Sequence, residues 1–189
     1  MKRWDTGNWV WAAVALVWAV DAALVAAGLV RHTHASAHWT LGLPLLPLAV
    51  HGLRLRASIR AWPRGGMGGL LYVAGLWVLA AGQIVESFGD PIANSPLHTA
   101  GVVPSAVGMA LLMAASIWLL ATAVRTKSLP LWAAAAAVAA VFAVIRWNAA
   151  QEDNHSAVLL IFTLGYWLLL RVDRRSSPTP GHGRATTKS

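Results

Sequence analysis

The feature that most constrains this chain is a series of long apolar runs that contain almost no charged residues. Two of them, from Gly68 to Phe88 and from His98 to Val124, flank a polar elbow. Only 12% of the 189 residues are charged and 57% are hydrophobic, whereas a soluble domain carries about 25% charged residues. Uncharged runs of about 18 or more residues would leave a soluble fold with too much apolar surface to cover. The sequence therefore predicts an all-α membrane protein.

Six such runs predict a six-helix transmembrane bundle that forms one domain over residues 1–175. The predicted spans are residues 8–30, 39–55, 68–88, 98–124, 129–147 and 157–171. The first run is longer than the core of a signal peptide, which is about 7–15 residues, although Ala35-Ser36-Ala37 resembles a cleavage site. We therefore expect a retained first span. Residues 176–189 are polar and are predicted to form a disordered tail.

Two spans carry features that bear on helix packing. Pro44 and Pro47 remove backbone donors from the second span, so we expect that helix to kink. The fifth span holds alanine at most positions from Ala133 to Ala143. Small residues let helix backbones approach closely in lipid, so we expect the fifth span to be a central packing element.

The distribution of basic residues predicts the orientation. All but Arg31 and Arg146 of the 15 lysines and arginines lie in segments on one side of the predicted bundle. Because cytoplasmic loops carry the excess of Lys and Arg, both termini are predicted to be cytoplasmic. The composition is typical of a bacterial genome rich in G and C, which indicates a multi-pass protein of the bacterial cytoplasmic (inner) membrane.

The net charge of +8 does not indicate nucleic acid, because the charges lie in short loops between apolar spans. The loop after the second span interleaves four arginines with apolar residues: Arg54, Arg56, Arg60 and Arg64. We expect these arginines to bind anionic lipid headgroups. An ordinary cytoplasmic loop is the alternative, and homo- or hetero-oligomeric partners are left open.

Polar side chains near the predicted outer face are the candidates for a ligand site. Gln83, Glu86 and Asp90 share one helical stripe at the end of the third span. Asp21 lies within the first span, where an acid costs about 2.5 kcal/mol or more. We expect an outward-facing polar pocket lined by five residues: Asp21, Gln83, Glu86, Asp90 and His98. The alternatives are a solvated helix end at the elbow and, for Asp21, a hydrogen bond to Gln83, Thr163 or Tyr166.

Histidines near the same face suggest a metal ion. Imidazole suits zinc, copper or nickel, and His34 and His38 would share a helical face. The candidate ligands are His34, His38 and His98, with a solvated histidine loop as the alternative. No cofactor is otherwise predicted, because cysteine is absent and the sequence contains neither a catalytic nor a nucleotide-binding motif.

Three short motifs carry a family resemblance. They are Gly-Gly-Met-Gly-Gly after the arginine loop, Ala-Gly-Gln-Ile-Val-Glu-Ser-Phe-Gly-Asp-Pro, and Leu-His-Thr-Ala-Gly. Residues 65–175 resemble a bacterial six-helix integral membrane family that is loosely related to DRAM-like proteins. In that family an Asp-Pro elbow and a following histidine join two spans, which corresponds to Asp90, Pro91 and His98. The resemblance implies the architecture and no particular activity.

These observations leave three hypotheses for function. The leading one is a non-enzymatic protein that binds or moves a small solute, lipid or ion in the outward-facing pocket. The second is a membrane-embedded metal-dependent hydrolase that uses the histidines with Glu86 or Asp90. The third is a structural subunit of a membrane complex, in which the small-residue fifth span would serve as the interface.

Overall fold

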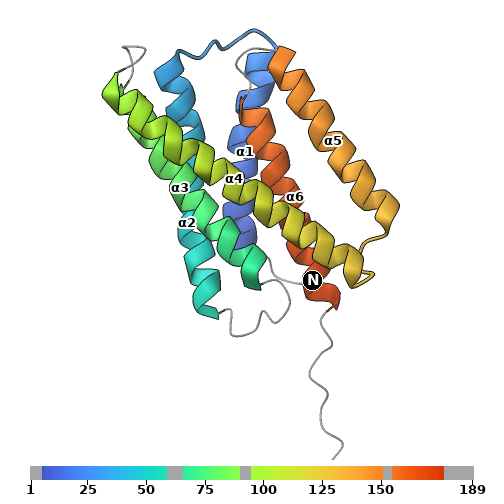
Figure 1. Ribbon diagram of the computed structural model, residues 1–189. Coiled ribbons are helices and arrows are strands. Elements are labelled where there is room, and N and C mark those ends of the chain that lie inside the picture. The colour runs from blue at the N-terminus through green and yellow to red at the C-terminus, as the bar shows by residue number, and fades with distance from the viewer. Residues whose placement is uncertain (1–5, 59–65, 90–94, 151–154, 177–189) are drawn as a thin grey trace, which may run out of the picture.

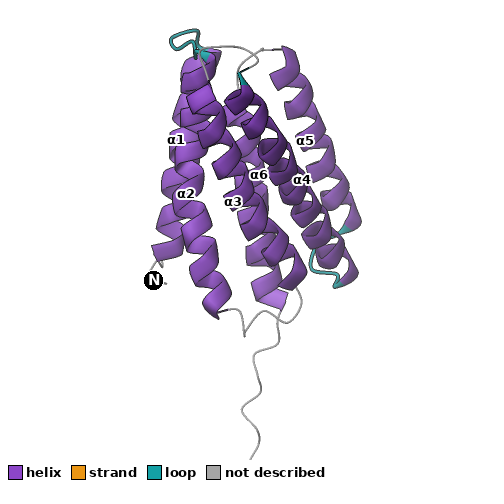
Figure 2. Cartoon of the chain, turned by 60° about the vertical axis from the view of Figure 1, so that its left-hand side comes forward, coloured by secondary structure: helices purple, strands orange, loops and turns teal. Residues whose placement is uncertain are grey.

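The chain folds into six helices that lie side by side (Figures 1 and 2). The computed structural model describes residues 6–58, 66–89, 95–150 and 155–176, and every regular element in those ranges is an α-helix. The helices are α1 (Thr6–Ala26), α2 (His34–Ser58), α3 (Gly66–Gly89), α4 (Pro96–Arg125), α5 (Leu131–Ala150) and α6 (His155–Ser176). The prediction of an all-helical chain with six helices is therefore confirmed. Most of the predicted tail lies outside the described residues.

Three of the helices are long and apolar enough to cross a membrane. The qualifying segments are Trp9–Ala26 in α1, Met67–Gly89 in α3 and Pro96–Arg125 in α4. Shorter apolar segments occur in α5 and α6, at Leu131–Ala143 and Ser156–Gly165. Because the helices alternate in direction, α1 ends, α2 begins, α3 ends and α4 begins at the same end of the bundle (Figure 1). We call this the site end.

The ends of α1 and α2 differ from the predicted spans for local reasons. Helix α1 ends at Ala26, because Gly28 adopts a positive φ of 69° and the Leu29 amide donates to the Leu24 carbonyl. A glycine in the left-handed conformation is a common way for a helix to terminate. Helix α2 begins at His34, where the Thr33 hydroxyl accepts the Ser36 amide. It then runs without a break through Pro44 and Pro47.

The core cluster draws side chains from α1, α2, α3 and α4 and, through Leu159, from α6. Trp18 of α1 is fully buried, and its indole nitrogen donates to the Thr40 carbonyl at 3.3 Å. Leu45 of α2 and Leu76 of α3 are almost fully buried in the same cluster. Close packing of large side chains around Trp18 fixes the position of α1 against α2 and α3.

Helices α3 and α4 form the most extensive helix pair, and glycines set their separation. On α3 the glycines recur every seven residues, at Gly68, Gly75, Gly82 and Gly89, and on α4 the matching positions are Gly101 and Gly108. A Cβ added to Gly82 would lie 2.5 Å from the Ser105 nitrogen, and one added to Gly101 would lie 2.6 Å from the Glu86 nitrogen. The two backbones are therefore in direct contact, as small residues allow.

The prediction that the fifth span is a central packing element is wrong. Helix α5 lies at the edge of the bundle, contacts mainly α6, and exposes most of its alanines (Figure 1). Trp132 and Phe142 are also exposed, at 74% and 64%. The reason is that alanines all around a helix define no single close-packing face, whereas glycines seven residues apart on α3 do.

The close α3–α4 contact predicts that adding a single methyl group at one of its glycines lowers the stability of the protein. Gly108→Ala places a Cβ against the backbone of Leu79, which cannot rotate away, so the free energy of unfolding should fall by about 1–3 kcal/mol. Gly165→Ala is the matched control, because a Cβ there meets nothing within 4 Å. Thermal unfolding of the purified variants in detergent measures the difference. Equal melting temperatures for the two variants would contradict the close backbone contact.

Candidate metal centre

Two histidines and a glutamate from three different helices converge at the site end. His38 lies near the start of α2, Glu86 near the end of α3, and His98 in the first turn of α4. One ligand atom from each residue lies within 4.8 Å of the other two. His38 and Glu86 are buried and His98 is half-buried. We call this set the His–Glu–His cluster.

Hydrogen bonds orient the His38 ring within the cluster. Its Nδ1 lies 2.9 Å from the Gln83 side-chain oxygen, and its Nε2 lies 3.2 Å from Glu86 Oε2. Because an amide oxygen only accepts, Nδ1 carries the hydrogen and Nε2 is turned toward Glu86. The Gln83 amide nitrogen in turn donates to the Ser105 hydroxyl at 3.0 Å. A chain of hydrogen bonds from α4 through α3 thus fixes the imidazole of α2.

Glu86 presents one oxygen that the protein leaves unsatisfied. The residue is only 5% exposed, and its Oε1 is buried without a hydrogen-bond partner among the residues that the structure describes. A buried carboxylate is costly unless it is paired or coordinates a cation. The cluster therefore has the electrostatic character of a cation site.

The α3–α4 glycines place the cluster. Glu86 lies against Gly101, His98 lies against Gly89, and Ser105 lies against Gly82. In each pair a side chain or its backbone occupies space that a Cβ would fill. Ser95 also caps α4 by accepting the His98 amide at 3.0 Å, which fixes the first turn of α4. The close approach of α3 and α4 is thus what brings Glu86 and His98 together.

The donor set suits a transition metal such as zinc. Zinc binds imidazole nitrogen and carboxylate oxygen at about 2.0–2.2 Å, so ligand atoms around a tetrahedral ion lie about 3.4 Å apart. The separation of His38 Nε2 and Glu86 Oε2, 3.2 Å, is close to that value. Metal-binding histidines commonly donate their other ring N–H to an oxygen acceptor. Gln83 provides that acceptor for His38.

Asp21 belongs to a second cluster at the same end of the bundle. His32 Nε2 lies 2.8 Å from Asp21 Oδ1, and the Ser156 hydroxyl donates to Oδ2. These contacts join α1 to the segment before α2 and to the first turn of α6. These contacts differ from the predicted pairing of Asp21 with Gln83 or Thr163, and the Tyr166 side chain lies outside the residues whose side chains are described. The reason is that Gln83 is already engaged between His38 and Ser105.

The predicted site residues are thus distributed as follows. Gln83, Glu86 and His98 of the predicted pocket lie together, and His38 of the predicted metal ligands joins them. The His34 side chain and Asp90 lie outside the described residues. Sequence reasoning chose His34, His38 and His98 as the metal ligands, and it joined Glu86 to the histidines only in the hydrolase hypothesis, as an alternative to Asp90. The sequence offered one indirect signal that His38 and Glu86 are neighbours. In an antiparallel bundle, the start of α2 and the end of α3 lie at the same end.

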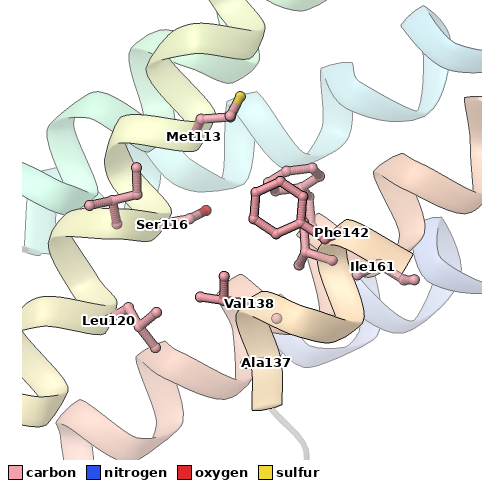
Figure 3. Close-up of a pocket in the computed structure, with 11 residues that line it drawn as sticks. Met113, Ser116, Leu120, Ala137, Val138, Phe142 and Ile161 are labelled. Carbon is pink, nitrogen blue, oxygen red and sulfur yellow. The ribbon is translucent and has the colours of Figure 1, made fainter. Parts of the chain in front are cut away.

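An apolar cavity of about 270 Å³ lies between α4, α5 and α6, away from both clusters (Figure 3). Phe142 and Val138 of α5 face Met113 and Leu120 of α4 across it. Its one hydroxyl, that of Ser116, donates to the Leu112 carbonyl. The cavity therefore offers no polar chemistry.

Comparison of the chain with protein-family models, curated proteins and solved structures found no match, so the resemblance to the DRAM-related family stays a prediction from its motifs.

The second cluster predicts a loss of stability when Asp21 is truncated. Asp21→Ala removes the acceptor of both His32 and Ser156, so the free energy of unfolding should fall by about 1–3 kcal/mol. Asp21→Asn should cost less, because its amide oxygen still accepts the Ser156 hydroxyl. Thermal unfolding measures both variants. A melting temperature for Asp21→Ala equal to that of the wild type would show that the cluster does not hold α1 to α6.

Proposed function

We propose that the chain is a six-span protein of the bacterial cytoplasmic membrane with both termini in the cytoplasm. Three helices of sufficient length and apolarity support a membrane location. The paucity of Lys and Arg at the site end supports the orientation, because positively charged loops stay cytoplasmic. The site end then faces away from the cytoplasm. The arginines expected at lipid headgroups, Arg54, Arg56, Arg60 and Arg64, lie outside the residues whose side chains are described.

We further propose that the protein binds a divalent transition-metal ion, zinc in the first place, at the His–Glu–His cluster. The observation that carries this proposal is the convergence of three donors within 4.8 Å in a buried setting. The unsatisfied oxygen of Glu86 and the fixed ring of His38 support it. A metal ion would neutralise the buried carboxylate and complete its coordination.

Binding is favoured over transport across the membrane. On α3 the side chains that follow Gln83 toward the opposite end are Leu79 and Leu76, and both are buried. Trp18 and Leu45 complete an apolar layer below the cluster. Among the described residues, these four side chains offer an ion no oxygen or imidazole ligand, so crossing the layer would cost far more than staying at the cluster.

A metal-dependent hydrolase is the second candidate, and the identity of the ligands favours it. Two histidines and a glutamate are a ligand set of catalytic zinc sites, which keep a further position for water or substrate. Such a metal lowers the pKa of its bound water and so produces a nucleophile at neutral pH.

Metal analysis tests the proposed function directly. Protein purified without added metal should carry about one equivalent of zinc or a related ion by inductively coupled plasma mass spectrometry. Glu86→Gln and His98→Ala should each lose it, because each removes one of three donors. His32→Ala is the matched control, since His32 contacts Asp21 rather than the cluster. Equal metal content in all variants, or none in the wild type after incubation with zinc, would contradict the proposal.

The orientation can be tested because the chain has no cysteine. Leu29→Cys and Leu131→Cys form a matched pair: the two leucines are 74% and 73% exposed, at the site end and at the opposite end. A membrane-impermeant maleimide should label Leu29→Cys in intact spheroplasts and Leu131→Cys only after lysis. The reverse pattern, or labelling of both in intact spheroplasts, would contradict the proposed topology.

A further inference from the structure

We propose that the metal centre keeps an exchangeable coordination position and binds there the acyl group of an amphipathic carboxylic acid or amide. The ligand would approach beside the first turn of α4 with its apolar chain against Phe88 and Leu97. This inference rests on the proposed metal site, and it adds to that site a ligand of defined chemistry.

The described serines nearest the cluster in the chain are engaged in other hydrogen bonds. The Ser87 hydroxyl donates to the Ile84 carbonyl at 2.6 Å. Ser105 accepts from Gln83, and Ser95 donates to the Gly89 carbonyl. Three protein donors then remain among the described residues for an ion that takes at least four. The proposal assigns the remaining position to an exogenous oxygen.

The unsatisfied oxygen of Glu86 selects the chemistry of the ligand. Oε2 lies beside His38, so Oε1 is the atom of Glu86 that can accept a further hydrogen bond. A ligand that fits both features carries an oxygen donor for the metal next to an N–H or O–H group for Oε1. Carboxylic acids in their protonated form, primary and secondary amides, and hydroxamates have this arrangement, whereas ethers and esters lack the donor.

The rim of the centre is apolar, which predicts a ligand with a hydrocarbon chain. His98 is the half-buried member of the cluster, so we place the approach of the ligand on its side. Leu97 precedes His98 on α4 and Phe88 lies two residues after Glu86 on α3; they are 55% and 66% exposed, and we place the ligand's chain against them. Trp39 packs edge-on against Phe88 with ring centroids 5.3 Å apart, which fixes the phenyl ring in place. At the end of a membrane-spanning bundle these side chains lie where acyl chains and water meet.

Cobalt spectroscopy with two hydroxamates tests the inference without knowledge of the natural ligand. The full chain in lipid nanodiscs is loaded with Co²⁺, and its visible absorption is recorded during titration with acetohydroxamate or octanohydroxamate. Both probes should shift the cobalt bands, because both enter the coordination sphere. Octanohydroxamate should reach half-saturation at a concentration at least about tenfold lower, since its longer chain contacts the apolar rim.

A rim variant separates protein contacts from simple partition into the lipid. Partition of each probe into the lipid is the same for every variant. Phe88→Ser combined with Leu97→Ser should therefore reduce the ratio of the two half-saturation concentrations to less than about threefold. Acetohydroxamate should bind this double variant as it binds the wild type. If the double variant does not fold, Leu97→Ser alone is measured instead. Its ratio of half-saturation concentrations should lie between those of the wild type and the double variant. An unchanged difference in either variant would overturn the assignment of the rim.

The outcomes distinguish failure of the inference from failure of the proposed function. If Co²⁺ yields no ligand-field bands that depend on Glu86 and His98, then the metal site itself is wrong. If those bands form but neither hydroxamate shifts them, the site is closed and the exchangeable position is overturned while the metal site stands. If both probes shift the bands at equal concentrations, the position is open but the amphipathic ligand is overturned.

Discussion

The contact between the backbones of α3 and α4 is the constraint on which the rest of the structure depends. Glycines spaced seven residues apart on α3 meet Gly101 and Gly108 on α4, so the two helices approach more closely than any larger side chain permits. Where lipid surrounds a protein, apolar side chains gain little from contacting one another rather than acyl chains. Close packing of this kind is then the main source of specific association.

The same contact determines the chemistry at the site end. Gly101 and Gly89 leave room for Glu86 and His98, and the short distance between the helices forces the carboxylate out of solvent. Gln83 and Ser105, which meet across Gly82, then hold His38 in one orientation. A compensating positive charge favours the burial of a carboxylate beside two imidazoles. The packing of α3 against α4 thus buries a carboxylate that a metal ion would stabilise.

The sequence predicted those features that depend on composition over a long stretch. Uncharged runs identified the six helices, and the rarity of acids in apolar spans pointed to Asp21 and Glu86. Features that depend on which helix faces which were harder to predict. The alanines of α5 suggested a packing helix, yet α5 is peripheral, and Asp21 contacts His32 and Ser156 rather than Gln83. The glycine spacing on α3 was the available signal for the true packing pair.

The central claim is that His38, Glu86 and His98 together coordinate one metal ion, and X-ray absorption at the zinc edge tests it most directly. Zinc-loaded protein should show a first shell of nitrogen and oxygen at about 2.0–2.1 Å and the outer-shell scattering of two imidazole rings. That imidazole scattering should be absent from His98→Ala, which loses the bound zinc. A spectrum of hydrated zinc with oxygen neighbours alone, unchanged by the variant, would contradict the account.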